Sequence, residues 1–203
     1  MGGVRTEHIA EDNLGYLWFA SWDNGASRFD GDRFELFTRS DGLCGDRVYA
    51  IHLDRHQRLW FATTSGVCWY DGEHFHSLNQ DGIADRPVQY LYEDQQGRVW
   101  CGGTGTLGYF NGTEYRDLVP LYEQQYGQPP SPHWTNECWG IAQDLSGNIW
   151  FGFDYLVRFD DESFFRYDVE DGFPQDATCY VVGSDQAGTV WIGRAGDQQG
   201  LWR

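Results

Sequence analysis

A tryptophan followed by an acid and an amide, Trp22-Asp23-Asn24, separates two segments rich in strand-forming residues. An indole can stack on a sugar ring while the neighbouring polar groups hydrogen-bond to its hydroxyls. Arg47 and Arg86 carry the forked guanidinium group that binds anionic ligands. Each residue also has a structural interpretation, in which Trp22 packs on a neighbouring sheet and the arginines form surface ion pairs. For each residue taken alone the structural interpretation is the favoured one, and binding of a small polar or carbohydrate-like ligand is the functional hypothesis.

Residues for catalysis or metal binding show no comparable pattern. The six histidines recur at no equivalent spacing, and no Gly-x-Ser-x-Gly motif is present. His74 and His76 are expected on one face of a strand, but no acid pair completes a site. Asp23, Asp154 and Asp197 offer oxygen ligands without the spacing of a calcium loop. We therefore expect no catalytic residue, no cofactor and no metal site.

The charge of the chain narrows the choice of partners. Fourteen Lys and Arg residues stand against thirty-one Asp and Glu, which gives a formal net charge of -17. Such a surface repels phosphate backbones and anionic lipid, so nucleic acid and membrane surfaces are poor partners. No apolar stretch is long enough to span a bilayer, and residues 1–12 lack the pattern of a signal peptide. Either the protein stays in the cell or an export signal lies outside this sequence.

The five cysteines are far apart and form no Cys-x-x-Cys pair. A zinc cluster is therefore not expected. We predict five reduced thiols, and we expect Cys138 and Cys179 to be buried because they occupy equivalent places in an internal repeat.

The internal repeat is defined by an aspartate and a tryptophan. An aspartate is followed six residues later by a tryptophan in five places: Asp12 and Trp18, Asp54 and Trp60, Asp94 and Trp100, Asp144 and Trp150, and Asp185 and Trp191. The tryptophans recur at intervals of 40 to 50 residues, which suits a four-stranded propeller blade or a helical repeat. Short β-rich runs between Gly, Asp and Asn clusters favour strands, and no helical period is sustained.

The sequence thus predicts an all-β propeller of about five units, each with four antiparallel strands and the last one short. It is either a closed five-bladed ring or part of a larger ring. The repeat divides the single domain, 1–203, into units of about 4–45, 46–85, 86–136, 137–176 and 177–203. A Pro-rich insertion at 119–137 interrupts the period. Its aromatic residues, namely Tyr122, Tyr126, His133 and Trp134, suggest a lid, an oligomer contact or a mobile loop.

The repeated aspartate and tryptophan are predicted to be structural. The carboxylate can accept hydrogen bonds from the amides of a turn, and the turn glycine can take positive φ. The tryptophan then lies on the second strand, where its ring fills the wedge between neighbouring sheets. Gln57 replaces the turn glycine in the second unit, so that turn is expected to be of another type or strained.

Ligand sites of a propeller form where loops converge on one face. The loops that precede each inner strand and those that join the second and third strands share a face. The candidate ligand-binding residues on this face are Trp22, Asp23, Asn24, Arg47, Arg86, Trp134, Asn136, Asp154, Tyr155 and Arg194.

Two segments resemble a known repeat. "VYAIHLDRHQRLWFATTSGVCWYDG", with Asp41-Gly42-Leu43 before it, and "CWGIAQDLSGNIWFGFDYLVRFD" resemble the two-component regulator propeller repeat. The resemblance covers almost the whole chain apart from the insertion. It implies a sensor part of a bacterial signalling protein that recognises carbohydrate fragments or transmits a signal by dimer rearrangement. It also implies a periplasmic or extracytoplasmic location, while a cytoplasmic one stays open.

We therefore expect a non-catalytic recognition module for a small polar ligand or a protein. A second copy or other signalling domains are further possible partners. One alternative is a lyase of the streptogramin-lyase type, which uses a metal and a histidine. Another is an assembly scaffold that pairs through an open blade edge.

Overall fold

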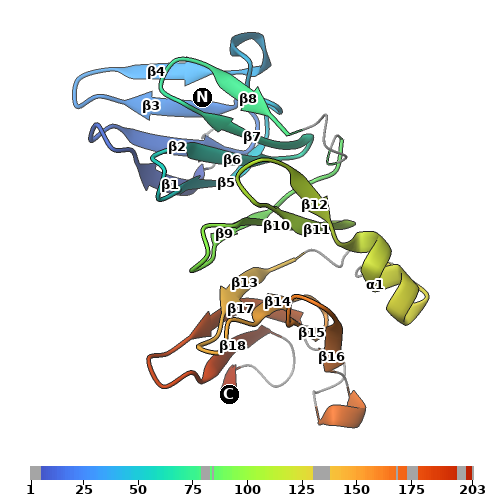
Figure 1. Ribbon diagram of the computed structural model, residues 1–203. Coiled ribbons are helices and arrows are strands. Elements are labelled where there is room, and N and C mark those ends of the chain that lie inside the picture. The colour runs from blue at the N-terminus through green and yellow to red at the C-terminus, as the bar shows by residue number, and fades with distance from the viewer. Residues whose placement is uncertain are drawn as a thin grey trace.

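The computed structural model describes residues 6–78, 83, 85–129, 138–167, 169–172, 178–195 and 200–202. Its strands form five antiparallel sheets that follow one another along the chain (Figure 1). The first sheet contains β1 (Thr6–Glu11), β2 (Leu17–Ser21), β3 (Ala26–Phe29) and β4 (Phe34–Phe37). The second contains β5 (Val48–Leu53), β6 (Leu59–Thr63), β7 (Gly66–Tyr70) and β8 (Phe75–Ser77).

The remaining sheets repeat this order of neighbouring strands. The third contains β9 (Tyr90–Glu93), β10 (Val99–Gly103), β11 (Thr106–Phe110) and β12 (Tyr115–Asp117). The fourth contains β13 (Gly140–Gln143), β14 (Ile149–Gly152), β15 (Leu156–Phe159) and β16 (Phe164–Tyr167). The fifth has three strands, β17 (Thr178–Ser184), β18 (Val190–Ala195) and β19 (Gly200–Trp202).

The sheets meet through their first strands. β1 packs beside β5, β5 beside β9, β9 beside β13, and β13 beside β17. These five strands are therefore the inner strands, as in the blades of a propeller. Within the described residues, no sheet hydrogen bonds join the first sheet to the fifth. Figure 1 places these two sheets at opposite ends of the array.

Each repeat aspartate holds its turn and its tryptophan together. In the second sheet, Oδ1 of Asp54 accepts the backbone N–H groups of His56 and Arg58, both at 2.9 Å. Its other oxygen, Oδ2, accepts the indole N–H of Trp60 at 2.8 Å. The equivalent indole bonds in the other four sheets measure 2.7 to 2.8 Å. A spacing of six residues is therefore the one that brings the indole N–H back to the carboxylate that caps the turn.

The indole rings pack between adjacent sheets. Trp18, Trp60 and Trp100 are fully buried, whereas Trp150 and Trp191 are partly exposed. Full burial of a tryptophan hides about 150–250 Å². At about 25 cal/mol per Å², each buried ring contributes at most about 4–6 kcal/mol.

The turn at Gln57 has the same hydrogen bond as its glycine counterparts. Its N–H donates to the carbonyl of Asp54 at 2.9 Å, and Gly97 donates to Asp94 at 3.0 Å. Gln57 has φ of +65°, close to the +83° of Gly97. The turn is thus of the same type, and a residue with a Cβ occupies the left-handed region at a cost in free energy.

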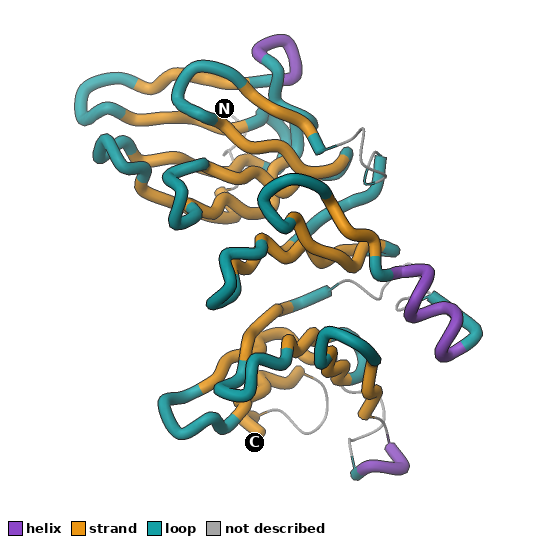
Figure 2. Tube along the Cα trace, in the orientation of Figure 1, coloured by secondary structure: helices purple, strands orange, loops and turns teal. Residues whose placement is uncertain are grey.

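The all-β prediction is confirmed, and the described part of the insertion contains a short α-helix. α1 (Val119–Tyr126) follows β12 directly and ends at Gly127, whose φ is +73°. Tyr122 is fully buried, with its ring 5.2 Å from that of Phe164. The hydroxyl of Tyr126 donates to the carbonyl of Phe164 at 2.9 Å. Tyr122 and Tyr126 therefore hold α1 against Phe164 on β16 of the fourth sheet and do not form a lid. Figure 2 shows α1 as the purple helix at the right, after the third sheet. His133 and Trp134 lie outside the described residues.

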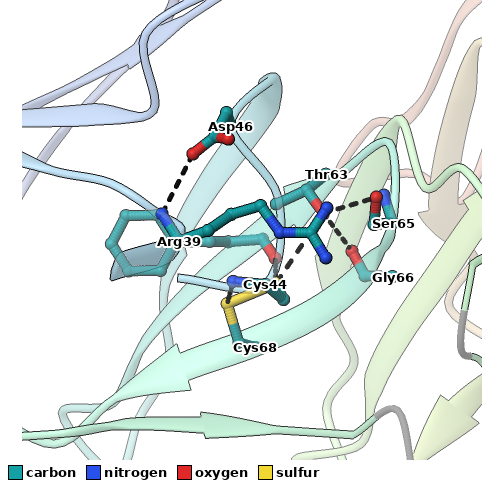
Figure 3. Close-up of a disulfide and its surroundings, with 8 residues drawn as sticks. Arg39, Cys44, Asp46, Thr63, Ser65, Gly66 and Cys68 are labelled. Carbon is teal, nitrogen blue, oxygen red and sulfur yellow. Dashed lines mark hydrogen bonds between the residues drawn. A yellow bond between two sulfur atoms is a disulfide. The ribbon is translucent and has the colours of Figure 1, made fainter. Parts of the chain in front are cut away.

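Two of the five cysteines form a disulfide, so the prediction of five reduced thiols was wrong. Cys44, in the link before β5, is bonded to Cys68 on β7 (Figure 3). The residues are 24 positions apart, and only the return of the third strand past the link brings them together. Cys101, Cys138 and Cys179 are free and buried. Burial raises the pKa of the Cys138 thiol to about 12.

Candidate functional site: a pocket along the inner strands

A pocket of about 370 Å³ lies along the inner strands of the first three sheets. We call it the inner-strand pocket. Its lining residues are Glu7, His8, Trp22, Tyr49, Ala50, Ile51, His52, Gln89, Tyr90, Leu91 and Trp139. The volume is in the range of small-molecule sites, and the wall combines aromatic rings with a few polar groups.

One position of the repeat supplies much of this wall. The residue five places before the repeat aspartate is Glu7, Tyr49, Gln89 and Trp139 in the first four units, and all four line the pocket. In β1 and β5 the pairing with the second strand shifts register at this residue, which forms a β-bulge. A bulge leaves one residue unpaired and redirects its side chain. The bulges thus provide a physical means of turning Glu7 and Tyr49 towards the pocket.

The aromatic part of the wall comes from different elements. Trp22 lies in the loop after β2, and its ring meets that of Tyr49 edge to face at 5.6 Å. Tyr90 and Trp139 come from the third and fourth units. Trp22, Tyr49, Tyr90 and Trp139 are all partly exposed, so their rings keep surface that a ligand can cover.

The polar part contains two imidazoles, an amide and a carboxylate. Gln89 is fixed, because its Oε1 accepts the backbone N–H of Thr104 at 3.1 Å and its Nε2 donates to the Thr104 hydroxyl at 3.2 Å. Partial burial and the nearby His52 lower the pKa of His8. Burial also lowers the pKa of His52, and this effect outweighs the opposing attraction of Glu93, 3.7 Å away. Both imidazoles are therefore predominantly neutral at pH 7.

His8 and His52 lie in the same pocket, which the spacing of histidines in the sequence did not predict. They hold non-equivalent places in the repeat, yet the tertiary structure brings both to one pocket. His76, by contrast, lies on the outer strand β8, where its ring stacks on Trp69 at 4.1 Å and its Nε2 is 2.6 Å from Oδ2 of Asp71. Across the described part of the chain, no group of three His, Cys, Asp or Glu side chains is arranged to hold a metal ion.

Arg47 is engaged by the loop that carries Trp22. Its guanidinium lies 4.3 Å from the centre of the indole ring. Its Nε donates to the carbonyl of Trp22 at 3.0 Å, and its Nη2 lies 3.6 Å from Oδ1 of Asp23. Arg47 therefore braces the position of Trp22. Asp23 and Asn24 line a different hollow, together with Thr38 and Arg39.

Arg86, Asp154 and Tyr155, which were also predicted to bind ligand, do not line the inner-strand pocket. Arg86 forms an ion pair with Asp117 at 2.8 Å. This is the structural role that was the alternative to ligand binding. Tyr155 is buried, and its hydroxyl accepts a hydrogen bond from Tyr122 at 3.2 Å. Asp154 adjoins it in the loop between β14 and β15. Trp134, Asn136 and the side chain of Arg194 lie outside the described residues.

The sequence held a signal for the residues that reasoning from loops missed. Aligning the units on their aspartates places Tyr49, Gln89 and Trp139 in one column of large polar or aromatic side chains. Tyr49 lies within β5, and Gln89 and Trp139 directly precede β9 and β13, so none of them stood out among the charged and aromatic residues of the loops.

The repeated sheets and their Asp–Trp pairs define a propeller-type repeat protein. Residues 42–65 and 82–105 match the two-component regulator propeller family. These two segments carry the repeat of that family. No curated protein sequence matches it. Within the described residues, no helix has the length and apolar character to cross a membrane.

Solved structures share the fold. The extracellular domain of a hybrid two-component system from B. thetaiotaomicron has a TM-score of 0.74 at 20% identity, covering 98% of this chain and 27% of that chain. The extracellular domain of a one-component system from the same organism has a TM-score of 0.71 at 19% identity, covering 97% of this chain and 26% of that chain. The chain therefore spans about a quarter of the length of these domains.

An enzyme shares the fold as well. Virginiamycin B lyase from Staphylococcus aureus, in complex with quinupristin, has a TM-score of 0.69 at 12% identity. The match covers 100% of this chain and 70% of that chain. At these identities the three structures establish a common fold, and the chemistry of this chain must be argued from its own residues.

Proposed function

We propose that the chain is a recognition module in the extracytoplasmic sensor part of a signalling protein. In this proposal it binds a small neutral polar ligand, carbohydrate-like in shape, in the inner-strand pocket. Two matched structures are extracellular domains of signalling systems, which supports the setting. The two segments that match the two-component regulator propeller family support the class of protein.

The observation that carries the proposal is the composition of the pocket wall. Four aromatic side chains face the same cavity as an amide and two imidazoles. Aromatic rings cover the apolar faces of a sugar, and the polar groups hydrogen-bond to its hydroxyls. The lining contains no lysine or arginine and one carboxylate, Glu7, so it disfavours an anionic ligand.

The disulfide supports the proposed location. Disulfides persist in oxidising compartments and are rare in the cytosol. For protein purified without reductant and then denatured, we expect three reactive thiols, from Cys101, Cys138 and Cys179. Reduction before denaturation should raise this number to five. Five thiols without reductant, in protein exported to a periplasm, would contradict the bond between Cys44 and Cys68.

Binding is tested by calorimetry with a panel of neutral oligosaccharides that differ in sugar and linkage. We expect one of them to bind, and we expect Trp139→Ala and Tyr49→Ala each to weaken its affinity at least tenfold. Phe165→Ala, which removes a partly exposed ring from the outer strand β16, is the matched control and should leave affinity unchanged. Equal affinity in all three variants would exclude the pocket, and no binding to any member of the panel would count against a carbohydrate.

A lyase is the second candidate, and the pairing of His8 with His52 in one pocket is the observation that favours it. The same protein, incubated with a streptogramin and magnesium, should leave the antibiotic intact if the recognition proposal is right. Ring opening that is lost in His8→Ala or His52→Ala would replace that proposal with an enzymatic one.

A further inference from the structure

The chain contains two Asn-Gly pairs, Asn24-Gly25 and Asn111-Gly112. An asparagine before a glycine is the one that loses its side-chain amide most readily, because glycine has no Cβ to shield its backbone nitrogen. The two pairs share this chemistry, so the structure around each pair decides whether it reacts.

Asn111-Gly112 lies at the tip of the hairpin between β11 and β12, and both residues are exposed. The space beside Gly112 is open, since a Cβ at this residue would meet no atom within 4 Å outside the adjacent residues. Across the described part of the chain, the N–H of Gly112 donates no hydrogen bond. Its nitrogen is therefore accessible for reaction.

The side-chain amide of Asn111 is held by its oxygen. Oδ1 accepts the backbone N–H groups of Thr113 and Glu114, both at 3.0 Å, and the hydroxyl of Thr113 at 2.8 Å. Three donors stabilise the negative charge that Oδ1 gains when a nucleophile adds to Cγ, in the manner of an oxyanion hole. Addition of the Gly112 nitrogen to this carbon closes a five-membered ring.

The fold encloses the other pair. Asn24-Gly25 lies in the loop after β2, where the N–H of Gly25 donates to the carbonyl of Asp46 at 2.6 Å. Gly25 is buried, and a Cβ there would lie 2.1 Å from the carbonyl oxygen of Phe37. Because its nitrogen is hydrogen-bonded and enclosed, the ring closure that is open to Asn111 is blocked at Asn24.

The repeat shows that an aspartate fits the position of Asn111. The equivalent residues of the first, second and fourth units are Asp30, Asp71 and Asp160. Each accepts two backbone N–H groups of its turn through Oδ1, at 2.7 to 3.1 Å. These hydrogen bonds lower the pKa of all three carboxyl groups. The turn therefore favours a carboxylate over the amide that the third unit carries.

We propose that Asn111 is a modification site that deamidates to aspartate, while Asn24 stays intact. The nitrogen of Gly112 bonds to Cγ of Asn111, the Cγ–Nδ2 bond breaks, and the proton that this nitrogen loses leaves with the departing ammonia. Water then opens the cyclic imide. Cleavage of the bond to Cγ leaves aspartate in a normal backbone, and cleavage of the bond to the main-chain carbonyl carbon leaves isoaspartate. Water is the only co-reactant, and the inference is independent of ligand binding.

Peptide mapping by mass spectrometry, after incubation of the folded chain between pH 7 and pH 9, tests this proposal. We expect the peptide that contains Asn111 to gain about 1 Da, and to do so at least tenfold faster than the peptide that contains Asn24. The rate should rise with pH, because the Gly112 nitrogen must lose its proton.

The chain unfolded in urea is the matched control, since both Asn-Gly pairs are then exposed and should react at similar rates. Equal rates in the folded chain would overturn the proposal. So would an intact Asn111 in the folded chain beside a reactive one in urea, because the hydrogen bonds to Oδ1 would then protect the amide.

The variant Asn111→Asp tests whether the turn accepts the product. It should unfold at a higher urea concentration than the unchanged chain at pH 7, whereas Asn24→Asp should bring no such gain. A lower unfolding midpoint for Asn111→Asp would overturn the assignment of aspartate as the product that this turn favours.

Discussion

Two positions of the repeat behave in opposite ways. The aspartate that caps the turn and the tryptophan six residues later are the same in all five units. The residue five places before the aspartate is Glu7, Tyr49, Gln89, Trp139 and Tyr180 in turn, a different choice in almost every unit. A position that maintains the spacing between sheets keeps the same residue in every unit, whereas the residue at a position that faces a cavity varies.

The difference has a physical cause. At the invariant positions a carboxylate, two turn amides and an indole satisfy one another, and the ring fills a wedge of fixed width. A smaller residue there leaves a cavity and an unpaired acceptor. At the variable position Glu7, Tyr49, Gln89 and Trp139 line the inner-strand pocket, so the packing between sheets does not fix the size and polarity of the side chain.

The largest change in stability is expected when a buried indole is removed. Trp60→Ala should lower the free energy of unfolding by about 3–5 kcal/mol, because it opens a cavity between the second and third sheets. Trp191→Ala should cost clearly less, since that ring is partly exposed. Urea unfolding followed by circular dichroism measures both. Equal losses would mean that the indoles do not act through packing between sheets.

The carboxylates of the turns give a pH dependence. The indole hydrogen bond from Trp191 lowers the pKa of Asp185. Burial raises the pKa of Asp54, but hydrogen bonds from Trp60 and Arg58 outweigh it, so that pKa is also lowered. A carboxyl group with a lower pKa in the folded state stabilises the fold above its unfolded value of about 4 and loses this contribution as pH falls.

Stability should therefore decline as pH falls below about 4. Asp54→Asn should cost about 1–3 kcal/mol at pH 7 and flatten this acid-side slope, because the charged acceptor is gone. Urea titrations at several pH values check the slope. An unchanged slope in Asp54→Asn would assign the acid sensitivity to other groups.

The variable position should behave differently. Tyr49→Ala should reduce stability by about 1 kcal/mol or less, since its ring is partly exposed and stands on a bulge. The same variant should lose most of its ligand affinity. A loss of stability as large as that of Trp60→Ala would show that the position is structural and would remove the contrast.

The smallest effect concerns the turn of the second unit. Gln57→Gly should raise the free energy of unfolding by up to about 1 kcal/mol, because glycine takes positive φ without strain. Asp161 also has positive φ, at +75°, but forms an ion pair with Arg98. Asp161→Gly should therefore gain less than Gln57→Gly. Thermal unfolding of the two variants compares them.

Much of the fold was predictable because its signals are local. The spacing of Asp54 and Trp60, the turn residues between them and the β-rich runs on either side lie within a few residues of one another. The strands, the sheets of four and the short last sheet follow from them. The helix α1 was missed because it is one short segment within an insertion, with no period to reveal it.

The candidate site was only partly predictable. Trp22 lines the inner-strand pocket, whereas Arg47 packs on the Trp22 ring and does not line the pocket. Tyr155 is buried and contacts Tyr122 of α1, a helix that the repeat pattern does not contain. Cys44 and Cys68 gave no pairing signal, because the link and the third strand meet only after the sheet has formed.

The sequence by itself determined the unit: one turn, one capped indole and one set of strands, five times over. Hydrogen bonds and strand periodicity act over a few residues, so they can be read directly from the chain. Only the tertiary structure decided which side chains share a cavity, which sulfur atoms meet and which strands pack beside one another. Those outcomes depend on how sheets stack and where bulges redirect side chains, and they join residues such as His8 and His52 from different units.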